Sequence, residues 1–451
     1  MSRLLEGGST MPVSHYSTFQ QQEKNMRLLD ACSYACAVML IGLLTFGDAV
    51  AQSAGQEANR NAALARAALG QPGRADIDLH IREILDKYYS DVRFYVGGAS
   101  NSSAWLLPNN RARLEMFMTQ FSYITPNNAF KQTDVYVMPG AEWMCEEYKA
   151  WIEIARNNNM VMRAHGPIGP QSSRWIKGLQ AQGYRAGTRT PEELWHVLKH
   201  FMTNLSKDIE KNSDVIKWMD VVNETITGVP RGSYQPGDWF GPIEGAGFQN
   251  PWLMLGQDDS CDLRVPLYII KAFELANAHA PSVKKLFNQN DYLEKPVWDK
   301  IKATVKFLRA RGLQIDALGW QAHVPLGWEK KPENMAYLEY IIDWCRANDL
   351  EFHITELNVV RDPRLSPETQ HEQAELYYAL TSMLARKAVE GATVGLSFWD
   401  FVSTPPRSQF GGNRALPRGG LFDVGLSLQT PQYLAVKRAL LDNVPKRDNG
   451  Y

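Results

Sequence analysis

The chain has 451 residues, of which 44% are hydrophobic, and it carries 48 basic and 49 acidic side chains. It is long enough to bury a large core, and its near-zero net charge argues against nucleic acid or an anionic membrane surface as the main partner. The 13 Trp and 18 Tyr residues offer flat faces that suit sugar rings, although a large core also uses such side chains.

The first segment, residues 1–51, has the composition of a leader. An uncharged apolar run, "ACAVMLIGLLTF" at 35–46, follows Arg27, and Ala49 and Ala51 form a small-residue cleavage pattern. The run is shorter than the ~20 residues of a membrane-spanning helix. It therefore predicts a secretory signal cleaved after Ala51, with Met26 as a candidate true start and a buried helix as the alternative. We expect a secreted or periplasmic protein without a membrane segment in its mature form.

Three cysteines, Cys145, Cys261 and Cys345, would remain after removal of this leader. They show no CxxC spacing, so the sequence does not predict a zinc cluster. One disulfide with a free thiol and three buried free cysteines are both compatible with this number.

The remainder divides into an Ala-rich linker at 52–76 and one expected domain at 77–445. Short apolar runs alternate in this domain with amphipathic stretches. The runs are "FYVGGA" near 94, "FSYITP" near 121, "MVMRAH" near 160, "WMDVVNE" near 218, "KLFNQN" near 285, "ALGWQAH" near 317, "EFHITEL" near 351 and "GLSFWDF" near 395. Alternating strands and helices of this number predict an α/β fold, a (β/α)₈ TIM barrel. An open doubly wound sheet is less favoured, because no glycine-rich phosphate turn follows the first run.

Polar residues gather where these runs end, which is where a barrel of this kind places its active site. They are Lys131, His165, Asn223, Glu224, Gln289, Asn290, Tyr292, Gln321, His323, Glu356 and Trp399. One such residue is usually a helix cap or a satisfied hydrogen bond. Convergence from seven strands favours a binding or catalytic site.

Two of these residues are carboxylates, Glu224 in "DVVNE" and Glu356 in "HITELN". Each alone could serve a salt bridge or a structural hydrogen bond. A pair at one barrel mouth is what glycoside hydrolysis requires, because one group protonates the leaving oxygen while the other attacks the anomeric carbon or activates water.

Seven motifs occur in an order and spacing that resemble glycoside hydrolase family 10, the β-1,4-xylanase family. They are "TPNNAFK" (125–131), "VMRAH" (161–165), "DVVNE" (220–224), "FNQNDY" (287–292), "GWQAH" (319–323), "ITEL" (354–357) and "LFDVGLSLQTPQYLAVKRAL" (421–440). The resemblance covers nearly the whole expected domain. It implies cleavage of β-1,4-linked xylan or a related β-linked polysaccharide.

The resemblance also implies a role for each matching residue. Glu224 would be the general acid/base and Glu356 the nucleophile of a retaining mechanism. Asn223 would hold the sugar 2-hydroxyl, and His323 with Gln321 would orient Glu356. The remaining implied substrate contacts are His165, Lys131 and Asn128 on the glycone side, Trp399 as the floor of the site, and Tyr292.

Departures from the family pattern lie around the glycone side. The chain reads "GPIGPQSS" after His165, where the family has "TLVWHSQ"; Asn127 replaces a Glu, and Arg407 lies near a lost Trp. An inserted stretch at 229–251 carries Trp239, Phe240 and Phe248, which could border the aglycone side. The reaction class is therefore expected more firmly than the particular glycan.

Two other functions remain as alternatives. A carbohydrate-binding barrel without activity would explain the altered subsites, but it has no need of both carboxylates and their partners. A metal-dependent hydrolase is disfavoured, because His196 and His200 in "WHVLKH" lack the Glu of H-E-x-x-H. No metal and no cofactor are expected, since side chains carry both proton transfer and nucleophilic attack.

Overall fold

The computed structural model describes residues 75–100, 103–136, 140–170, 190–243, 250–359, 367–403, 420–423 and 425–445, all within the unit Leu64–Tyr451. The predicted leader and nearly all of the linker at 52–76 lie outside these ranges, as do Phe248 and Arg407.

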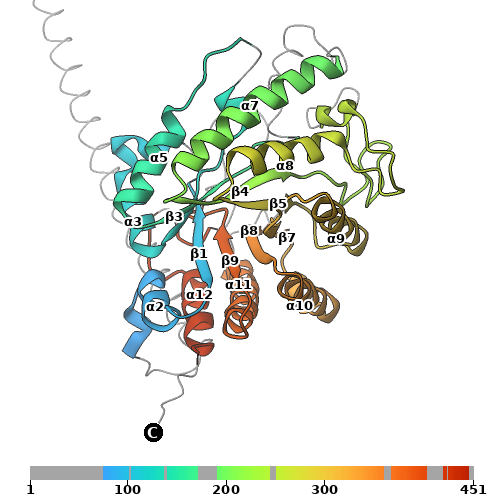
Figure 1. Cartoon of the computed structure of the whole chain (residues 1–451). Coiled ribbons are helices and arrows are strands. Elements are labelled where there is room, and N and C mark those ends of the chain that lie inside the picture. The colour runs from blue at the N-terminus through green and yellow to red at the C-terminus, as the bar shows by residue number, and fades with distance from the viewer. Residues whose placement is uncertain are drawn as a thin grey trace, which may run out of the picture. The chain divides into compact units, whose positions relative to one another are not determined.

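Eight parallel strands close into a barrel (Figure 1). Each neighbouring pair from β1 to β6 is parallel, β6 pairs with β8, β8 with β9, and β9 returns to β1. The eight barrel strands are β1 Phe94–Ala99, β2 Tyr123–Thr125, β3 Val161–Ala164, β4 Ile216–Asn223, β5 Lys284–Gln289, β6 Ala317–Trp320, β8 Glu351–Val359 and β9 Val394–Phe398. A short ninth strand, β7 His323–Val324, pairs with the end of β8. The predicted (β/α)₈ barrel is thereby confirmed.

Helices between the strands form the outer layer of the barrel, and Figure 1 shows α7 beside α8 and α11 beside α12. The α-helices are α2 Ile81–Tyr88, α3 Arg111–Gln120, α4 Gln132–Val135, α5 Glu146–Asn157, α7 Pro191–Lys211, α8 Leu267–His279, α9 Lys295–Ala310, α10 Pro332–Ala347, α11 Pro367–Val389 and α12 Pro431–Asp442. Short 3₁₀ helices are η1 Ala75–Asp78, η2 Ser103–Leu106, η3 Pro108–Asn110, η4 Pro251–Leu255 and η5 Trp328–Lys330.

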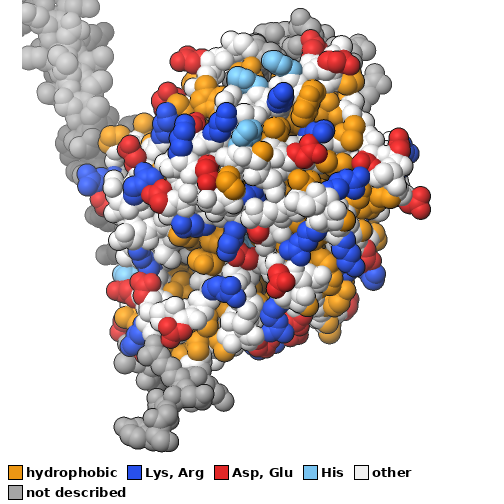
Figure 2. Space-filling view, viewed as in Figure 1, with side chains coloured by type: hydrophobic (Ala, Val, Ile, Leu, Met, Phe, Trp, Pro, Cys, Tyr) orange, Lys and Arg blue, Asp and Glu red, His pale blue; other side chains and the backbone are white. Residues whose placement is uncertain are grey.

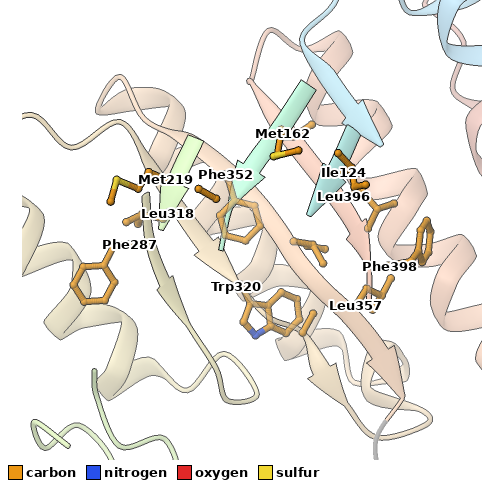
Figure 3. Packing of buried hydrophobic residues seen from close by; sticks show 14 of the residues in the cluster. Ile124, Met162, Met219, Phe287, Leu318, Trp320, Phe352, Leu357, Leu396 and Phe398 are labelled. Atoms are coloured by element: carbon orange, nitrogen blue, oxygen red, sulfur yellow. The ribbon is translucent and has the colours of Figure 1, made fainter. Parts of the chain in front are cut away.

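The strands are buried along nearly their whole length, which is expected when the barrel interior covers one face and helices cover the other. Their apolar side chains form one continuous core with the helices. Figure 3 shows Leu318, Phe352 and Leu396 among the strand residues of this core.

Local sequence signals explain where the outer helices begin. The Thr190 hydroxyl accepts from the Glu193 backbone N–H at 3.2 Å, while the Glu193 carboxylate accepts from the Thr190 N–H at 3.1 Å. This reciprocal cap, followed by Pro191 in the first turn, satisfies N–H groups that a helix start leaves without partners. At the start of α12, the Thr430 hydroxyl accepts from the Tyr433 N–H and Pro431 follows, without the reciprocal carboxylate contact.

The predicted run "ALGWQAH" is two strands rather than one. Ala322 lies between β6 and β7 with φ 57°, in the left-handed region, and this conformation interrupts the extended backbone. Pairing with β8 resumes at His323, opposite Asn358. The break is functionally relevant because Gln321 precedes it and His323 follows it.

On the face shown in Figure 2, basic and acidic side chains are interspersed rather than separated into blocks. Among the helices within the described ranges, none is long and apolar enough to cross a membrane.

Candidate active site

Glu224 lies directly after β4, at the carboxyl end of the barrel strands. Its φ of 55° turns the chain away from the strand, and its N–H donates to the Asn288 carbonyl at 3.0 Å. The Gln289 side chain fixes the next two residues, because its Oε1 accepts from the N–H groups of Thr225 (3.1 Å) and Ile226 (3.2 Å). Gln289, predicted only as a strand-end polar residue, therefore holds the backbone that carries Glu224.

The Glu224 carboxyl group is 6% exposed and has two unlike oxygens. Gln321 Nε2 donates to Oε1 at 2.9 Å and to the Asn223 Oδ1 at 3.1 Å. Oε2 makes no hydrogen bond within the described residues. The expectation that Gln321 orients Glu356 was wrong: because Gln321 precedes the break at Ala322, its amide reaches back to the end of β4.

Glu356 lies on β8 and is 3% exposed, with donors around both oxygens. Asn288 Nδ2 donates to its Oε1 at 3.0 Å, and His323 Nε2 lies 3.3 Å from its Oε2. His165 Nδ1 lies 3.7 Å from Oε1. The predicted contact between His323 and Glu356 is present in this geometry.

These surroundings keep Glu356 ionised. Burial alone would raise its pKa, but the charge of His165 and the hydrogen bond and charge of His323 oppose this. Together with the Arg163 guanidinium they lower the pKa of Glu356 from its usual 4.5 to about 2. Burial lowers the pKa of His323, but the hydrogen bond and charge of Glu356 outweigh it, so this pKa is raised above the usual 6.5.

Asn288 is the central residue that the sequence reasoning missed. Its Nδ2 also donates to Asn223 Oδ1 at 2.8 Å, and its Oδ1 accepts from the Thr355 hydroxyl at 2.7 Å. One amide thus joins the end of β4 to Glu356. Gly319 leaves room for it, because a Cβ there would lie 2.5 Å from Asn288 Oδ1. Asn288 stands opposite Asn223 on the neighbouring strand, a register that only the structure reveals.

A buried ion pair lies inside the barrel beside this network. Arg163 on β3 and Asp220 on β4 have fully buried side chains and are hydrogen-bonded through Arg163 Nη1. Arg163 Nη2 also donates to the Thr355 carbonyl at 2.9 Å, next to Glu356. His165 Nδ1 lies 2.8 Å from Asp220 Oδ2, so the pair orients this imidazole as well.

Four residues were predicted to bind sugar on the glycone side or at the floor of the site: His165, Trp399, Lys131 and Asn128. The His165 ring stands edge-on to Trp399 at 5.3 Å between centroids, and His323 does so at 6.3 Å. Lys131 is 5% exposed, and its side chain passes beside Gly166. Asn128 is half-buried, and its carbonyl accepts from the Lys131 N–H at 2.9 Å.

The segment 166–170, "GPIGP", packs directly on these residues and is buried. The Ile168 carbonyl accepts from the Asn223 N–H at 2.8 Å. A Cβ at Gly169 would lie 2.6 Å from the Asn223 carbonyl oxygen. Backbone therefore occupies the space beside Asn223, and only glycine permits so close an approach.

Tyr292 is 37% exposed in the loop after β5. The expectation that Trp239 and Phe240 border the aglycone side was wrong, because they are only 6% and 2% exposed. Trp239 donates to the Leu263 carbonyl at 2.9 Å and lies under the Lys300 ammonium. Both rings are therefore buried, and Trp239 belongs to the hydrophobic core.

The described residues include no group of three or more His, Cys, Asp or Glu side chains that could hold a metal ion. His200 packs on the Tyr136 ring at 4.7 Å. Cys145, Cys261 and Cys345 are free, with Cys261 exposed and Cys345 buried.

A family model described as glycosyl hydrolase family 10 matches residues 84–406. The chain belongs to glycosyl hydrolase family 10. The suspected family resemblance is confirmed, and with it the prediction that the chain is a glycoside hydrolase of the xylanase-like class.

Relatives of this family 10 chain are distant in sequence. Endo-1,4-beta-xylanase B of Thermotoga neapolitana is 22% identical over 380 residues, covering 82% of this chain and 94% of that protein. Endo-1,4-beta-xylanase A of Caldicellulosiruptor sp. (strain Rt8B.4) is 24% identical over 336 residues, covering 71% of this chain but only 43% of its own length.

Solved structures share the barrel. Xylanase 10B from Thermotoga maritima superposes with a TM-score of 0.63 at 22% identity, covering 82% of this chain and all of that one. Xylanase 10B from Thermotoga petrophila RKU-1, solved in complex with xylobiose, gives a TM-score of 0.62 at 20% identity, covering 83% of this chain. At these identities the likeness concerns the fold.

Proposed function

We propose that this family 10 chain is a retaining glycoside hydrolase that cleaves β-1,4-linked xylan, or a related β-linked polysaccharide, by double displacement. The observation that carries the proposal is the contrast between two buried carboxyl groups. Glu356 is surrounded by donors and positive charge that keep it ionised, whereas Glu224 has one oxygen held by Gln321 and one without a hydrogen-bond partner among the described residues. An ionised nucleophile and a separately held acid/base are what the reaction needs.

In the first step, a Glu356 oxygen attacks the anomeric carbon while the bond to the leaving oxygen breaks. Glu224 gives its proton to that oxygen. In the second step, Glu224 takes a proton from water, whose oxygen attacks the anomeric carbon and releases the Glu356 carboxylate. Asn223, whose Oδ1 accepts from both Asn288 and Gln321, retains an amide nitrogen for a sugar hydroxyl.

The names of the relatives and the xylobiose complex of a structural neighbour support xylan as the substrate class. The buried segment 166–170 beside Asn223 and Lys131 supports a glycone side that differs from the family pattern. His165, Lys131, Asn128 and Trp399 are proposed to line that side, and Tyr292 the other.

The test compares Glu356→Ala and Glu224→Ala on xylan and on an aryl β-xyloside with a good leaving group. We expect Glu356→Ala to be inactive on both. Glu224→Ala should lose xylan hydrolysis yet release the aryl group, because a good leaving group does not need protonation. Glu274→Ala, at an exposed ion pair on α8, is the matched control.

Equal background rates for the unmodified protein and Glu356→Ala would contradict the proposal. Calorimetric binding of xylo-oligosaccharides without product would then indicate the carbohydrate-binding barrel. A screen of products released from several β-linked polysaccharides identifies the glycan.

A further inference from the structure

A line of side chains extends from Glu356 through His323 and Asn358 to Asp400. His323 Nε2 lies 3.3 Å from Glu356 Oε2, and His323 Nδ1 lies 2.7 Å from the Asn358 Oδ1. The Asn358 amide continues the line, because its Nδ2 donates to Asp400 Oδ2 at 2.9 Å. Asn358 is 3% exposed and Asp400 is 4% exposed, so the contact between them is shielded from water, whereas the His323 side chain is 26% exposed.

The carboxylate at the far end determines how the amide faces. The NH₂ group of Asn358 donates to Asp400 Oδ2, and a carboxylate in its ionised form offers only acceptors. The amide oxygen then points to His323, and it can accept only from a protonated Nδ1. The other tautomer, with its proton on Nε2 alone, would place two acceptors face to face at 2.7 Å.

We propose that Asp400 is a positioning residue that, acting through the Asn358 amide, holds His323 in the form protonated at Nδ1. A neutral His323 held in this form has a lone pair at Nε2, which faces the Glu356 carboxylate and cannot donate to it. His323 therefore supports Glu356 only as the doubly protonated imidazolium.

This inference rests on the proposed function for its catalytic consequence. The Nε2–H of the imidazolium stabilises the Glu356 carboxylate when the sugar ester breaks in the second step. Loss of one proton from His323 would remove that donor without any movement of the chain. We therefore expect activity to fall at alkaline pH as His323 loses this proton.

The groups that face His323 support this assignment. Glu356 on β8 and Glu224 after β4 both favour the positive form and raise the pKa of His323. The Trp399 ring stands edge-on beside it, and Asn358 contributes a neutral acceptor rather than a second charge. The proton on Nε2 therefore depends mainly on the charge of Glu356.

The first experiment reads the tautomer directly. Nitrogen-15 NMR of the imidazole rings distinguishes a protonated nitrogen from an unprotonated one, and the His323 signal is assigned by its loss in His323→Gln. Above the pKa of His323 we expect protonated Nδ1 and unprotonated Nε2. Observation of the Nε2–H form in the unmodified protein would overturn the proposal, whatever the activity.

The second experiment uses two isosteric changes. Asn358→Asp places a carboxylate against Nδ1–H, so the alkaline limb of kcat/KM should move up by about one pH unit or more. In Asp400→Asn the Asn358 amide can rotate, so the Nε2–H form of His323 should appear. Activity should then persist at pH values above the alkaline fall of the unmodified protein. Asn204→Asp, at a surface position on α7, should leave the limb unchanged.

The two proposals fail in different ways. If the tautomer is as expected but no variant or parent hydrolyses a glycoside, the proposed function fails and the positioning role of Asp400 stands. If hydrolysis occurs but both isosteric variants keep the tautomer and pH profile of the parent, the positioning role fails.

Discussion

At the scale of single residues, the site is built from amides that connect carboxyl groups. Asn288 joins Asn223 to Glu356, and Gln321 joins Asn223 to Glu224. A neutral amide can donate to a carboxylate without adding a charge that would change its proton affinity strongly. This arrangement fixes the position of both carboxyl groups, while the His and Arg side chains around Glu356 keep that group ionised.

The lowered pKa of Glu356 predicts a pH-dependent contribution to stability. A folded pKa of about 2 against a usual 4.5 means that the ionised group stabilises the fold above pH 4.5 and loses this effect as pH falls towards 2. Relative to Glu356→Gln, the parent should be more stable by up to ~3 kcal/mol above pH 4.5. Urea unfolding at a series of pH values measures the difference, which should shrink in acid; a difference independent of pH would contradict the assignment.

The buried ion pair predicts a large cost when one partner is removed. Asp220→Asn leaves the Arg163 guanidinium uncompensated inside the barrel, so the free energy of unfolding should fall by about 3–5 kcal/mol. The matched control is Asp214→Asn at the exposed Arg156 pair, which should cost less than ~1 kcal/mol. Equal losses in the two variants, measured by denaturant unfolding, would show that the buried pair is not a special case.

The sequence revealed residues at strand ends more readily than residues within strands. Glu224 directly follows β4, and Glu356 stands near the end of its apolar run although β8 continues to Val359, so their positions predicted a site. Three other site residues lie inside apolar runs, namely Asn288, Arg163 and Asp220. There the alternation of side chains along a strand does not show which of them will meet across neighbouring strands. The basic Arg163 in "MVMRAH" and the acidic Asp220 in "WMDVVNE" nevertheless indicated an ion pair, because opposite charges on neighbouring buried strands must pair.

At the scale of elements, the eight strand positions followed from the sequence because both faces of a barrel strand are buried and give continuous apolar runs. The division into β6 and β7 did not follow, since a left-handed Ala has no compositional signal. The inserted stretch was misjudged for a related reason. Aromatic residues in a long loop serve either a ligand or the loop's own core, and only packing distinguishes the two.

The contact between β1 and β2 predicts a sharp difference between adjacent glycines. A Cβ at Gly97 would lie 1.9 Å from the Tyr123 carbonyl oxygen, which is backbone and cannot rotate away. Gly97→Ala should therefore reduce the free energy of unfolding by at least ~3 kcal/mol. Gly98→Ala meets its nearest atoms at 3.1 Å and should cost about 1 kcal/mol. Thermal or urea unfolding compares them, and similar stability for both variants would contradict this account.

At the scale of the whole molecule, the barrel and the family follow from the alternation of elements and the order of motifs, whereas the fate of residues 1–51 depends on the cell. We propose that they form an export leader removed after Ala51, so the mature chain should begin at Gln52. Mass spectrometry of protein recovered from the periplasm or medium measures this terminus. Ala51→Asp should block cleavage, and processing that is unaffected by it would place the cleavage site elsewhere.

The closure of β9 onto β1 also brings the two ends of the described chain together. α2 packs against α12, as Figure 1 shows, and the Tyr89 hydroxyl donates to the Leu440 carbonyl at 2.6 Å. The order in which the eight units are synthesised is therefore not imposed by the barrel itself. A circular permutant that joins the ends by a short linker and opens at the turn around Gly312, between α9 and β6, should retain the fold. In such a protein the ribosome would produce the strand carrying Glu356 before the strand that precedes Glu224, and the same pocket would assemble in the opposite order.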